Sequence, residues 1–253
     1  MKLALLATDS SSTWMMLNAL SENYPDINVV IEKPISRLML LKRRIVRIGF
    51  VNVIGQILFM LYLPLLRFLT KKHIHSIEVN ACLATERPAG IIITRFESIN
   101  SQECIDWLRN ESPAIVILNG TRIVSSELLG SCNAIFFNIH CGITPAYRGV
   151  HGGYWALVRG DISNVGVNVH LVDVGIDTGN IIYQTAIKIY GKDNFLTYPV
   201  KQYVEGIPLM KQAIADVIAG NLRTYQRDDL SSAIWYHPTL WQYLWVRLTR
   251  GIG

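Results

Sequence analysis

An apolar run that ends in two polar residues constrains this chain more than any other feature. Residues 134–137 read Ala-Ile-Phe-Phe, which is typical of a buried strand. Because side chains alternate along a strand, Asn138 and His140 share one face and Ile139 lies on the other. Ligands of open α/β sheets bind at the carboxyl ends of strands. The sequence therefore predicts an α/β fold with a polar pair where chemistry is usually done.

These side chains carry groups suited to proton and acyl chemistry. The Asn138 amide can donate to a developing oxyanion, and His140 can move protons near neutral pH. Asp177 follows in the Gly-flanked segment VDVGIDTGNI, where its carboxylate can orient the imidazole or raise its basicity. Each residue alone is more often a cap or an ordinary hydrogen-bonding group. The combination of the three is what indicates a catalytic site.

The same stretch resembles the catalytic core of formyltransferases that use 10-formyltetrahydrofolate. That family has an N-x-H strand end, a loop of the type LLPxYRG and a D-x-G loop further on. This chain has Asn138-Ile139-His140, then ITPAYRG at 143–149, then Asp177-Thr178-Gly179. The sequence GVNVH at 166–170 is similar to the family's GVTIH strand, and Gly160-Asp161 also agrees. Ile143-Thr144 departs from the usual Leu-Leu. The resemblance covers residues 113–188.

The resemblance implies a Rossmann-like formyltransferase fold with a central, mostly parallel sheet flanked by helices. It also implies that 10-formyltetrahydrofolate is the co-substrate. A substrate amine would attack the formyl carbon while Asn138 donates to the carbonyl oxygen, His140 handles the proton and Asp177 orients His140. This chemistry needs no metal, and the Cys and His spacing of the chain suggests no metal site.

Further contacts are implied by the same resemblance. The cofactor-binding candidates are Asn119, Gly120, Thr121, Arg122 and Gly175, although a strand-to-helix turn without a ligand would look the same as residues 119–122. The substrate-binding candidates are Ser10, Ser11, Ser12, Tyr147, Arg148 and His151. The three serines stand at the first strand-to-helix turn, where they can hold an anion or simply cap the helix.

Periodicity divides the chain into alternating elements. Strands are predicted at 2–7, 27–32, 90–94, 114–118, 134–140, 165–172 and 180–188. Helices are predicted from 14–20, at 101–109, at 152–159 and at 200–219, the last kinked or restarted by Pro208. We expect a catalytic domain over residues 1–220, with a helical insertion at about 36–77, and an aromatic-rich tail over 221–253.

The insertion admits three interpretations. A basic run at 42–47 precedes nineteen uncharged residues, 48–66, and Arg67, Lys71 and Lys72 follow. By length and flanking charge this segment can span a bilayer or lie on a membrane surface. The third interpretation is a buried or dimer-forming helical hairpin. We expect the hairpin, because strands 2–7 and 114–118 must share one sheet and a single span would separate them.

The composition of the chain limits the classes of binding partner but does not identify one. The formal charge of +5 suits an anionic ligand or membrane surface, and it is small for a tRNA-binding protein. The four cysteines have no framework spacing, which favours a reducing cytoplasmic compartment, and Cys141 is expected to be a buried thiol. The tail aromatics are expected to dock on the domain, with a stacking platform or a membrane-proximal surface as alternatives. Their positions are Trp235, Tyr236, Trp241, Tyr243 and Trp245.

Three substrate classes compete within the resemblance. Relatives that formylate initiator tRNA carry a further C-terminal domain, and those acting on glycinamide ribonucleotide have a Gly-rich loop where this chain has serines. We therefore expect the amine of a nucleotide-linked amino sugar as substrate and no nucleic-acid partner. Another small amine, a formyl-folate hydrolase and a silent scaffold protein remain alternatives. The expected location is the cytoplasm, with contact at the inner face of the membrane and a homodimer as alternatives.

Overall fold

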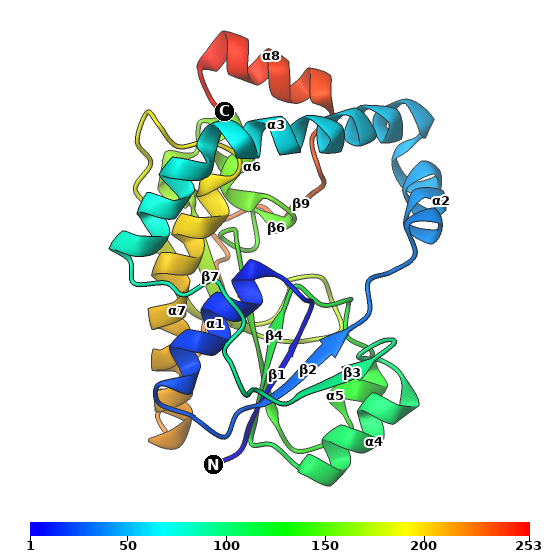
Figure 1. The fold of residues 1–253 in the computed structure, drawn as a ribbon, viewed down its shortest axis with the longest axis vertical. Helices are drawn as coiled ribbons and strands as arrows, with labels where there is room; N and C mark the ends of the chain where they lie inside the picture. Colours follow the sequence, from blue (N-terminus) through cyan, green and yellow to red (C-terminus); the bar gives the residue numbers. More distant parts are fainter.

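A seven-stranded sheet forms the centre of the molecule (Figure 1). The computed structural model describes the backbone of residues 1–253 and every side chain except that of Arg37. The strand order is β3-β2-β1-β4-β5-β7-β8. The strands are β1 (Leu3–Ala7), β2 (Asn28–Glu32), β3 (Ile93–Phe96), β4 (Ile115–Asn119), β5 (Ile135–His140), β7 (Gly166–Leu171) and β8 (Ile181–Ala186).

Pairing in the sheet is mostly parallel. The strands from β3 to β5 run parallel, with Leu5 of β1 aligned between Val29 of β2 and Ile117 of β4. Strand β7 is antiparallel to β5, and β8 is antiparallel to β7. The strand order reverses direction between β1 and β4, and such a switch point leaves a crevice at the carboxyl ends of the strands. The predicted fold class is confirmed.

Helices cover both faces of the sheet, which is why its strands are apolar throughout. Helices α1 (Ser11–Ser21) and α7 (Thr197–Ile218) pack on one face, with Leu5 and Phe137. Helices α4 (Gln102–Glu111) and α5 (Ser126–Leu129) pack on the other, with Leu6 and Val116. Successive residues of β1 thus enter opposite cores, as expected for a sheet buried on both sides.

A third, aromatic core lies beyond the carboxyl ends of the strands. Its rings include Phe59, Tyr154, Phe195 and Tyr243, with the centroids of Phe59 and Tyr243 4.9 Å apart. It is formed mainly by α7 together with α3 (Phe50–Asn80), α6 (Gly152–Arg159) and α8 (Leu240–Arg250). The remaining elements are α2 (Arg37–Ile48), a short 3-10 turn, Ile162–Asn164, after α6, and a two-stranded sheet of β6 (Arg148–Gly149) and β9 (Ile234–Trp235).

Residues 36–77 form two helices that are not buried as a hairpin within the chain, and the dimer-forming hairpin that we also expected stays a prediction. Helix α2 ends at Gly49, whose φ of 83° turns the chain, and α3 leaves at a steep angle to α2 (Figure 1). Only 28% of the residues in the most apolar 18-residue stretch of α3 are buried. Phe59 and Leu66 face the core, whereas Leu61 and Leu65 are 71% and 55% exposed. By length and composition alone, α3 is able to cross a membrane.

Smaller differences from the predicted elements have local causes. Helix α7 continues through Pro208 instead of restarting, because Pro208 is exposed and water can solvate the carbonyl that loses its partner. Strand β3 begins at Ile93 and not at residue 90, since residue 90 lies in a turn and residues 91–92 belong to no regular element. Elements α5, β6, β9 and α8 were not predicted.

Candidate active site

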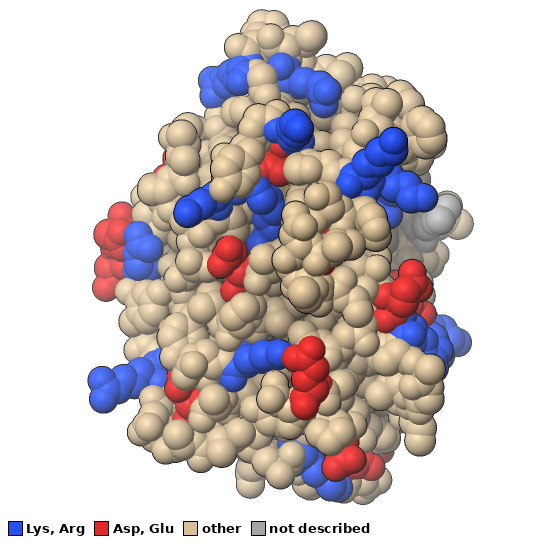
Figure 2. Space-filling view, turned by 60° about the vertical axis from the view of Figure 1, so that its left-hand side comes forward, with Lys and Arg blue, Asp and Glu red and all other residues tan. Residues whose placement is uncertain are grey.

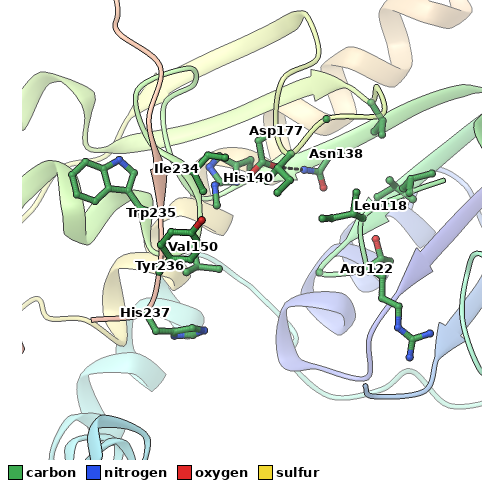
Figure 3. Close-up of a pocket in the computed structure, with 18 of the residues that line it drawn as sticks. Leu118, Arg122, Asn138, His140, Val150, Asp177, Ile234, Trp235, Tyr236 and His237 are labelled. Carbon is green, nitrogen blue, oxygen red and sulfur yellow. Dashed lines mark hydrogen bonds and ion pairs between the residues drawn. The ribbon is translucent and has the colours of Figure 1, made fainter. Parts of the chain in front are cut away.

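A pocket of about 560 Å³ opens at the carboxyl ends of β4 and β5 (Figure 3). One wall is the end of β4 with the loop that follows, residues 118–124, and another is the loop 172–177. The opposite side is formed by residues 234–237 of the tail and by one face of α2. Asn138, His140 and Asp177 all line this pocket, so the structure brings the three predicted catalytic residues together.

The three side chains form a connected group. The Nδ1 atom of His140 lies 3.3 Å from Oδ2 of Asp177, and Nδ2 of Asn138 donates to Oδ1 of the same carboxylate at 3.3 Å. The backbone N–H of Gly149 donates to Oδ2 at 2.9 Å. Asp177 has a φ of 50°, in the left-handed region, where Asp is tolerated better than most residues. That backbone turn presents the carboxylate to both partners.

His170 is a fourth member of the group that the sequence did not reveal. Its Nδ1 lies 2.7 Å from the carbonyl oxygen of Leu171, which can only accept, so Nδ1 carries the proton. The other ring nitrogen, Nε2, therefore accepts from Nδ2 of Asn138 at 3.1 Å. The N–H groups of Asn138 are thus directed at His170 and Asp177, and its carbonyl oxygen points toward the open pocket in Figure 3.

This orientation of Asn138 refines its expected role. As placed, the amide oxygen can accept a hydrogen bond from an incoming amine. Donation to an oxyanion requires the Asn138 amide to rotate and exchange one of its present acceptors for the substrate oxygen.

Both ring nitrogens of His140 face oxygen acceptors. Nε2 donates to the carbonyl oxygen of Tyr147 at 2.7 Å, and Nδ1 faces the Asp177 carboxylate. A neutral ring can donate to only one of these acceptors, whereas a protonated ring donates to both. The surroundings of His140 therefore suit a group that holds and delivers a proton.

Gly142 makes this geometry possible. A Cβ atom at Gly142 would lie 2.3 Å from the carbonyl oxygen of Tyr147 and 2.7 Å from Nε2 of His140. The loop after β5 folds back against the histidine so closely that no side chain fits. The sequence offered no signal for this beyond a glycine two residues after the N-x-H pattern.

Titration behaviour at the site follows from burial and neighbouring charge. Burial alone would raise the pKa of Asp177, but the His140 charge and the hydrogen bond from the Gly149 N–H outweigh it and hold the pKa well below its usual range. Asp177 is therefore a carboxylate at neutral pH. Burial, followed by the Asp177 charge, raises the pKa of the Cys141 thiol to about 12, so Cys141 is a neutral thiol.

Four of the five predicted cofactor contacts lie in the pocket wall, namely Gly120, Thr121, Arg122 and Gly175. Asn119 does not, and that expectation is corrected. It is fully buried, and its Nδ2 donates to Oγ1 of Thr13 at 3.0 Å. Alternation along β4 explains this, since Leu118 lines the pocket and the next side chain turns toward α1.

The arginine in this wall is held by the protein itself. The Arg122 guanidinium donates to the carbonyl oxygens of Lys33 and Glu97 at 2.7 and 2.6 Å, and it lies 3.5 Å from the Glu32 carboxylate. Arg122 therefore shapes the wall, and its charge is already compensated.

The predicted substrate contacts do not gather in the pocket. Ser10 accepts from the N–H of Thr13 as the N-cap of α1, and residues 10–12 lie outside the pocket lining. Tyr147 is 4% exposed and donates to Asp161 at 2.8 Å. Tyr147 was predicted as a substrate contact because it follows the catalytic pair closely in the sequence, but its side chain is buried. The serines were predicted to bind an anion or to cap the helix, and the structure uses Ser10 to cap α1.

The other two substrate candidates lie at the margins. Arg148 donates to the carbonyl oxygen of Ile176 at 3.3 Å and lines a smaller neighbouring cavity. The His151 ring lies behind the wall, where its Nε2 is 2.9 Å from Nδ1 of His237. The pocket also includes the tail residues Ile234–His237, whose aromatics were expected to dock on the domain and were considered for stacking only as an alternative. Sequence reasoning did not assign the arginines of α2 to the site, because that helix lies far from the motif in sequence.

Comparison with known proteins agrees with this arrangement. The sequence model of the formyl transferase family matches residues 68–203, which is more than half of the chain. The chain belongs to the formyl transferase family. The matched region includes the whole N-x-H, YRG and D-x-G pattern, so the predicted family resemblance is confirmed.

Individual relatives within the family differ in substrate. The methionyl-tRNA formyltransferase of Chlorobium limicola is 26% identical over 140 residues, 55% of this chain and 44% of that protein. An N-formyltransferase from Helicobacter canadensis, solved in complex with folinic acid and dTDP-3-aminofucose, has 18% identity and a TM-score of 0.57, covering 93% of this chain and 70% of the other. Glycinamide ribonucleotide transformylase 1 from Symbiobacterium toebii has 17% identity and a TM-score of 0.58, covering 92% and 94%. The chain spans less than half the length of the tRNA-modifying relative, and the structural similarity shows the shared family fold.

Proposed function

We propose that this chain is a folate-dependent enzyme that transfers a formyl group from 10-formyltetrahydrofolate to the amine of a nucleotide-linked amino sugar. The observation that supports this most is the meeting of Asn138, His140 and Asp177 at the end of β5, inside the large pocket of a formyl transferase fold. The four free cysteines are in keeping with a reducing, cytoplasmic location.

The pocket suits a cofactor of this kind. Its size lies within the range of about 300–1,000 Å³ usual for sites that hold drug-sized ligands. The wall at 118–124 combines apolar side chains, Leu118, Ile123 and Val124, with the glycine backbone of Gly120. Such a wall can take a flat ring by contact and by backbone hydrogen bonds. When bound, the cofactor supplies the formyl carbon that an amine attacks.

The residues of the chain have distinct parts in the proposed reaction. The amide oxygen of Asn138 accepts a hydrogen bond from the incoming amine, and the rotated amide donates to the oxygen that gains charge. The Nε2 proton of His140 stays on the Tyr147 carbonyl oxygen, so Nδ1 is the atom that takes the proton released by the amine nitrogen and returns it to the leaving nitrogen. Asp177 remains ionised and accepts from Nδ1 while that nitrogen carries the proton. The Helicobacter complex supports an amino-sugar acceptor, since it was solved with both folinic acid and dTDP-3-aminofucose.

A panel of acceptors tests the proposal. The purified chain is incubated with 10-formyltetrahydrofolate and either nucleotide-linked 3- or 4-amino sugars, glycinamide ribonucleotide or no amine. We expect a mass gain of one formyl group on an amino sugar. Formylation of glycinamide ribonucleotide alone would replace the proposed substrate, and formate release without an acceptor would indicate a hydrolase. No turnover under any condition would contradict the enzyme assignment.

A further inference from the structure

Helix α2 turns a basic face toward the pocket. Leu40, Arg43, Arg44, Arg47 and Ile48 line it, and their spacing places them on one side of an α-helix. The chain has no Asp or Glu anywhere from residue 33 to residue 77. The wall opposite the folate candidates is therefore positive, with no acidic residue on its own element.

The three arginines differ from the other arginines of the site. Arg122 is paired with Glu32, whereas no carboxylate in the described part of the chain lies within 4 Å of Arg43, Arg44 or Arg47. The Arg47 guanidinium lies over the Tyr236 ring, 5.1 Å from its centroid, which orients it along the pocket.

Partial burial makes the charge of Arg44 costly without a partner, whereas Arg43 and Arg47 are exposed at the rim of the pocket. Burial lowers the pKa of Arg44, and no neighbouring anion opposes that effect. An unpaired cation that has lost part of its hydration destabilises the protein, and a bound anion would remove that cost. The arrangement is what a site for an anionic ligand requires.

We infer that α2 binds the diphosphate of the acceptor, with Arg43, Arg44 and Arg47 as its ligands. This inference rests on the proposed function, because it assigns the part of the substrate that lies away from the amine. Arg matches phosphate with paired N–H groups, and residues one helical turn apart can serve adjacent phosphates. A ligand with a single carboxylate would need only one of these three arginines, whereas a diphosphate can use all of them.

The position of α2 gives the bound molecule a direction. Arg44 lies close enough to His237 for its charge to act on that ring, and His237 lines the same pocket as His140. Gln56, also in this wall, has a buried Oε1 with no partner among the described atoms, which a sugar hydroxyl would satisfy. A ligand anchored at α2 therefore places its sugar near Gln56 and its amine toward the catalytic group.

Titration calorimetry on the full chain tests this assignment with three probes: uridine or thymidine diphosphate, the corresponding nucleoside and folinic acid. We expect Arg43→Gln, Arg44→Gln and Arg47→Gln each to weaken diphosphate binding by roughly tenfold or more, with steep salt dependence. Lys42→Gln is the matched control, since it removes a charge from the same helix outside the pocket lining. Nucleoside and folinic acid binding should stay unchanged in all four variants.

Two results would overturn the inference. Unchanged diphosphate binding in all three variants would show that the phosphates lie elsewhere, and selective loss of folinic acid binding would assign the arginines to the cofactor's carboxylates. These outcomes are separable from failure of the proposed function. If diphosphate binding depends on the arginines but no amino sugar is formylated, the binding site stands and the transferase proposal fails.

A second, independent feature is the apolar end of the molecule formed by α3 and α8. The two helices lie side by side (Figure 1), with Tyr243 packed on Phe59 and the Trp241 ring against Gly55. The remaining outward faces expose large apolar side chains. They include Val51, Ile54, Leu58, Leu61, Leu65, Phe68, Trp245 and Leu248, each at least 40% exposed.

The charge of the surface formed by α3 and α8 indicates the kind of partner that it binds. The same helices carry basic side chains, and residues 230–253 contain no Asp or Glu. At the top of Figure 2, where α8 lies, basic side chains stand among uncharged ones and the acidic side chains lie further down. The basic residues are Arg67, Lys71, Lys72, Arg247 and Arg250. We propose that this end docks on an anionic lipid surface, with the apolar side chains in the interface and the cations at the headgroups.

A second copy fits this surface less well. A two-fold contact would place the basic residues of both copies near one another, and the carboxylate that the two helices carry, Glu78, is only 17% exposed and lies in the last turn of α3. An anionic lipid supplies the missing charge. Trp245 also suits the boundary between headgroups and acyl chains, where tryptophan is enriched.

Vesicle flotation tests the lipid assignment. We expect the wild type to float with vesicles of phosphatidylcholine and phosphatidylglycerol, to stay below with phosphatidylcholine alone and to be partly released by high salt. The double variant Trp245→Ser/Leu248→Ser should lose binding by roughly tenfold or more. Ile92→Ser is the matched control, because Ile92 is 86% exposed in the loop before β3, away from both helices.

Two outcomes would contradict it. A dimer in light scattering without lipid, lost in the double variant and accompanied by no flotation, would assign the surface to a second copy. Binding that resists both salt and alkaline extraction would indicate that α3 spans the bilayer.

Discussion

The Nδ1 atom of His140 lies 3.3 Å from Oδ2 of Asp177, although the first residue ends β5 and the second belongs to the loop between β7 and β8. The antiparallel pairing of β5 with β7 makes this contact possible, since Asn138 aligns with His170 and the loop beyond β7 folds back over the strand. The pair therefore exists only in the assembled sheet, and substitutions can separate its chemistry from its contribution to the fold.

Removing the charge of Asp177 tests the chemistry. Asp177→Asn keeps the shape of the side chain but no longer offers His140 a carboxylate, so we expect turnover to fall by roughly a hundredfold or more. His140→Ala and Asn138→Ala should lose a similar factor, because each acts mainly as charge and protons move. Initial rates with saturating acceptor measure the effect.

The control for these variants is folinic acid binding, which should persist because none of the three residues lies in the 118–124 wall. Wild-type turnover in His140→Ala would remove the catalytic assignment. A loss of turnover matched by loss of folding would show only that the group is structural.

The cofactor wall has its own test in thermal stability. A ligand that binds only the folded state stabilises it by about 2.7 kcal/mol at a concentration one hundred times its dissociation constant. Folinic acid should therefore raise the melting temperature progressively with concentration. A melting temperature that does not respond at millimolar folinic acid would exclude the folate pocket.

Gly142 links packing to catalysis. Its missing Cβ would lie 2.3 Å from the carbonyl oxygen of Tyr147, so Gly142→Ala must displace the loop or the His140 ring. We expect a loss of about 1–3 kcal/mol in unfolding free energy and up to roughly a hundredfold in turnover. Gly191→Ala is the control, because nothing lies within 4 Å of its Cβ position. If the two variants had the same unfolding free energy and the same turnover, the loop after β5 would be able to accommodate a Cβ atom at residue 142.

The half-buried pair of His151 and His237 predicts an acid-sensitive stability. Burial, followed by the Arg44 charge, lowers the pKa of His237 from 6.5 to about 4, and burial also lowers the pKa of His151. Below pH 6.5 the unfolded chain binds these protons while the folded chain does not. The stabilising contribution is therefore complete above pH 6.5 and is lost as pH falls toward 4.

Urea unfolding between pH 7 and 4.5 measures this effect. For His237 the difference amounts to at most about 3 kcal/mol, at about 1.4 kcal/mol per unit of pKa. The His237→Gln variant should show a flatter dependence on pH, and His75→Gln, whose side chain is 74% exposed, should match the wild type. A wild-type slope in His237→Gln would show that other groups cause the acid sensitivity.

Much of the site was predictable because its determinants are local. Asn138 and His140 follow from strand alternation, and the D-x-G loop follows the next strand pair. His170 and the α2 arginines were not predictable, since their roles depend on which elements meet in space. The prediction that Asn119 contacts the cofactor was wrong for the same reason. A residue at the end of an apolar strand can face the pocket or the opposite helix, and only the register of β4 against β1 decides which. The basic run at 42–47 gave a real signal, but charge alone does not distinguish a pocket wall from a membrane flank.

The two faces of α3 differ in how much they should matter to folding, and adjacent leucines provide a matched pair. Leu66 is 2% exposed and packs in the aromatic core, whereas Leu65 is 55% exposed on the outer face. Leu66→Ala should therefore cost about 2–5 kcal/mol of unfolding free energy, and Leu65→Ala should stay within about 0.5 kcal/mol of the wild type. Leu61→Asp, at a position that is 71% exposed, should fold normally in water. Urea unfolding at two protein concentrations separates the explanations, because a cost at Leu65 that grows with concentration would mean that a second copy covers this face in solution.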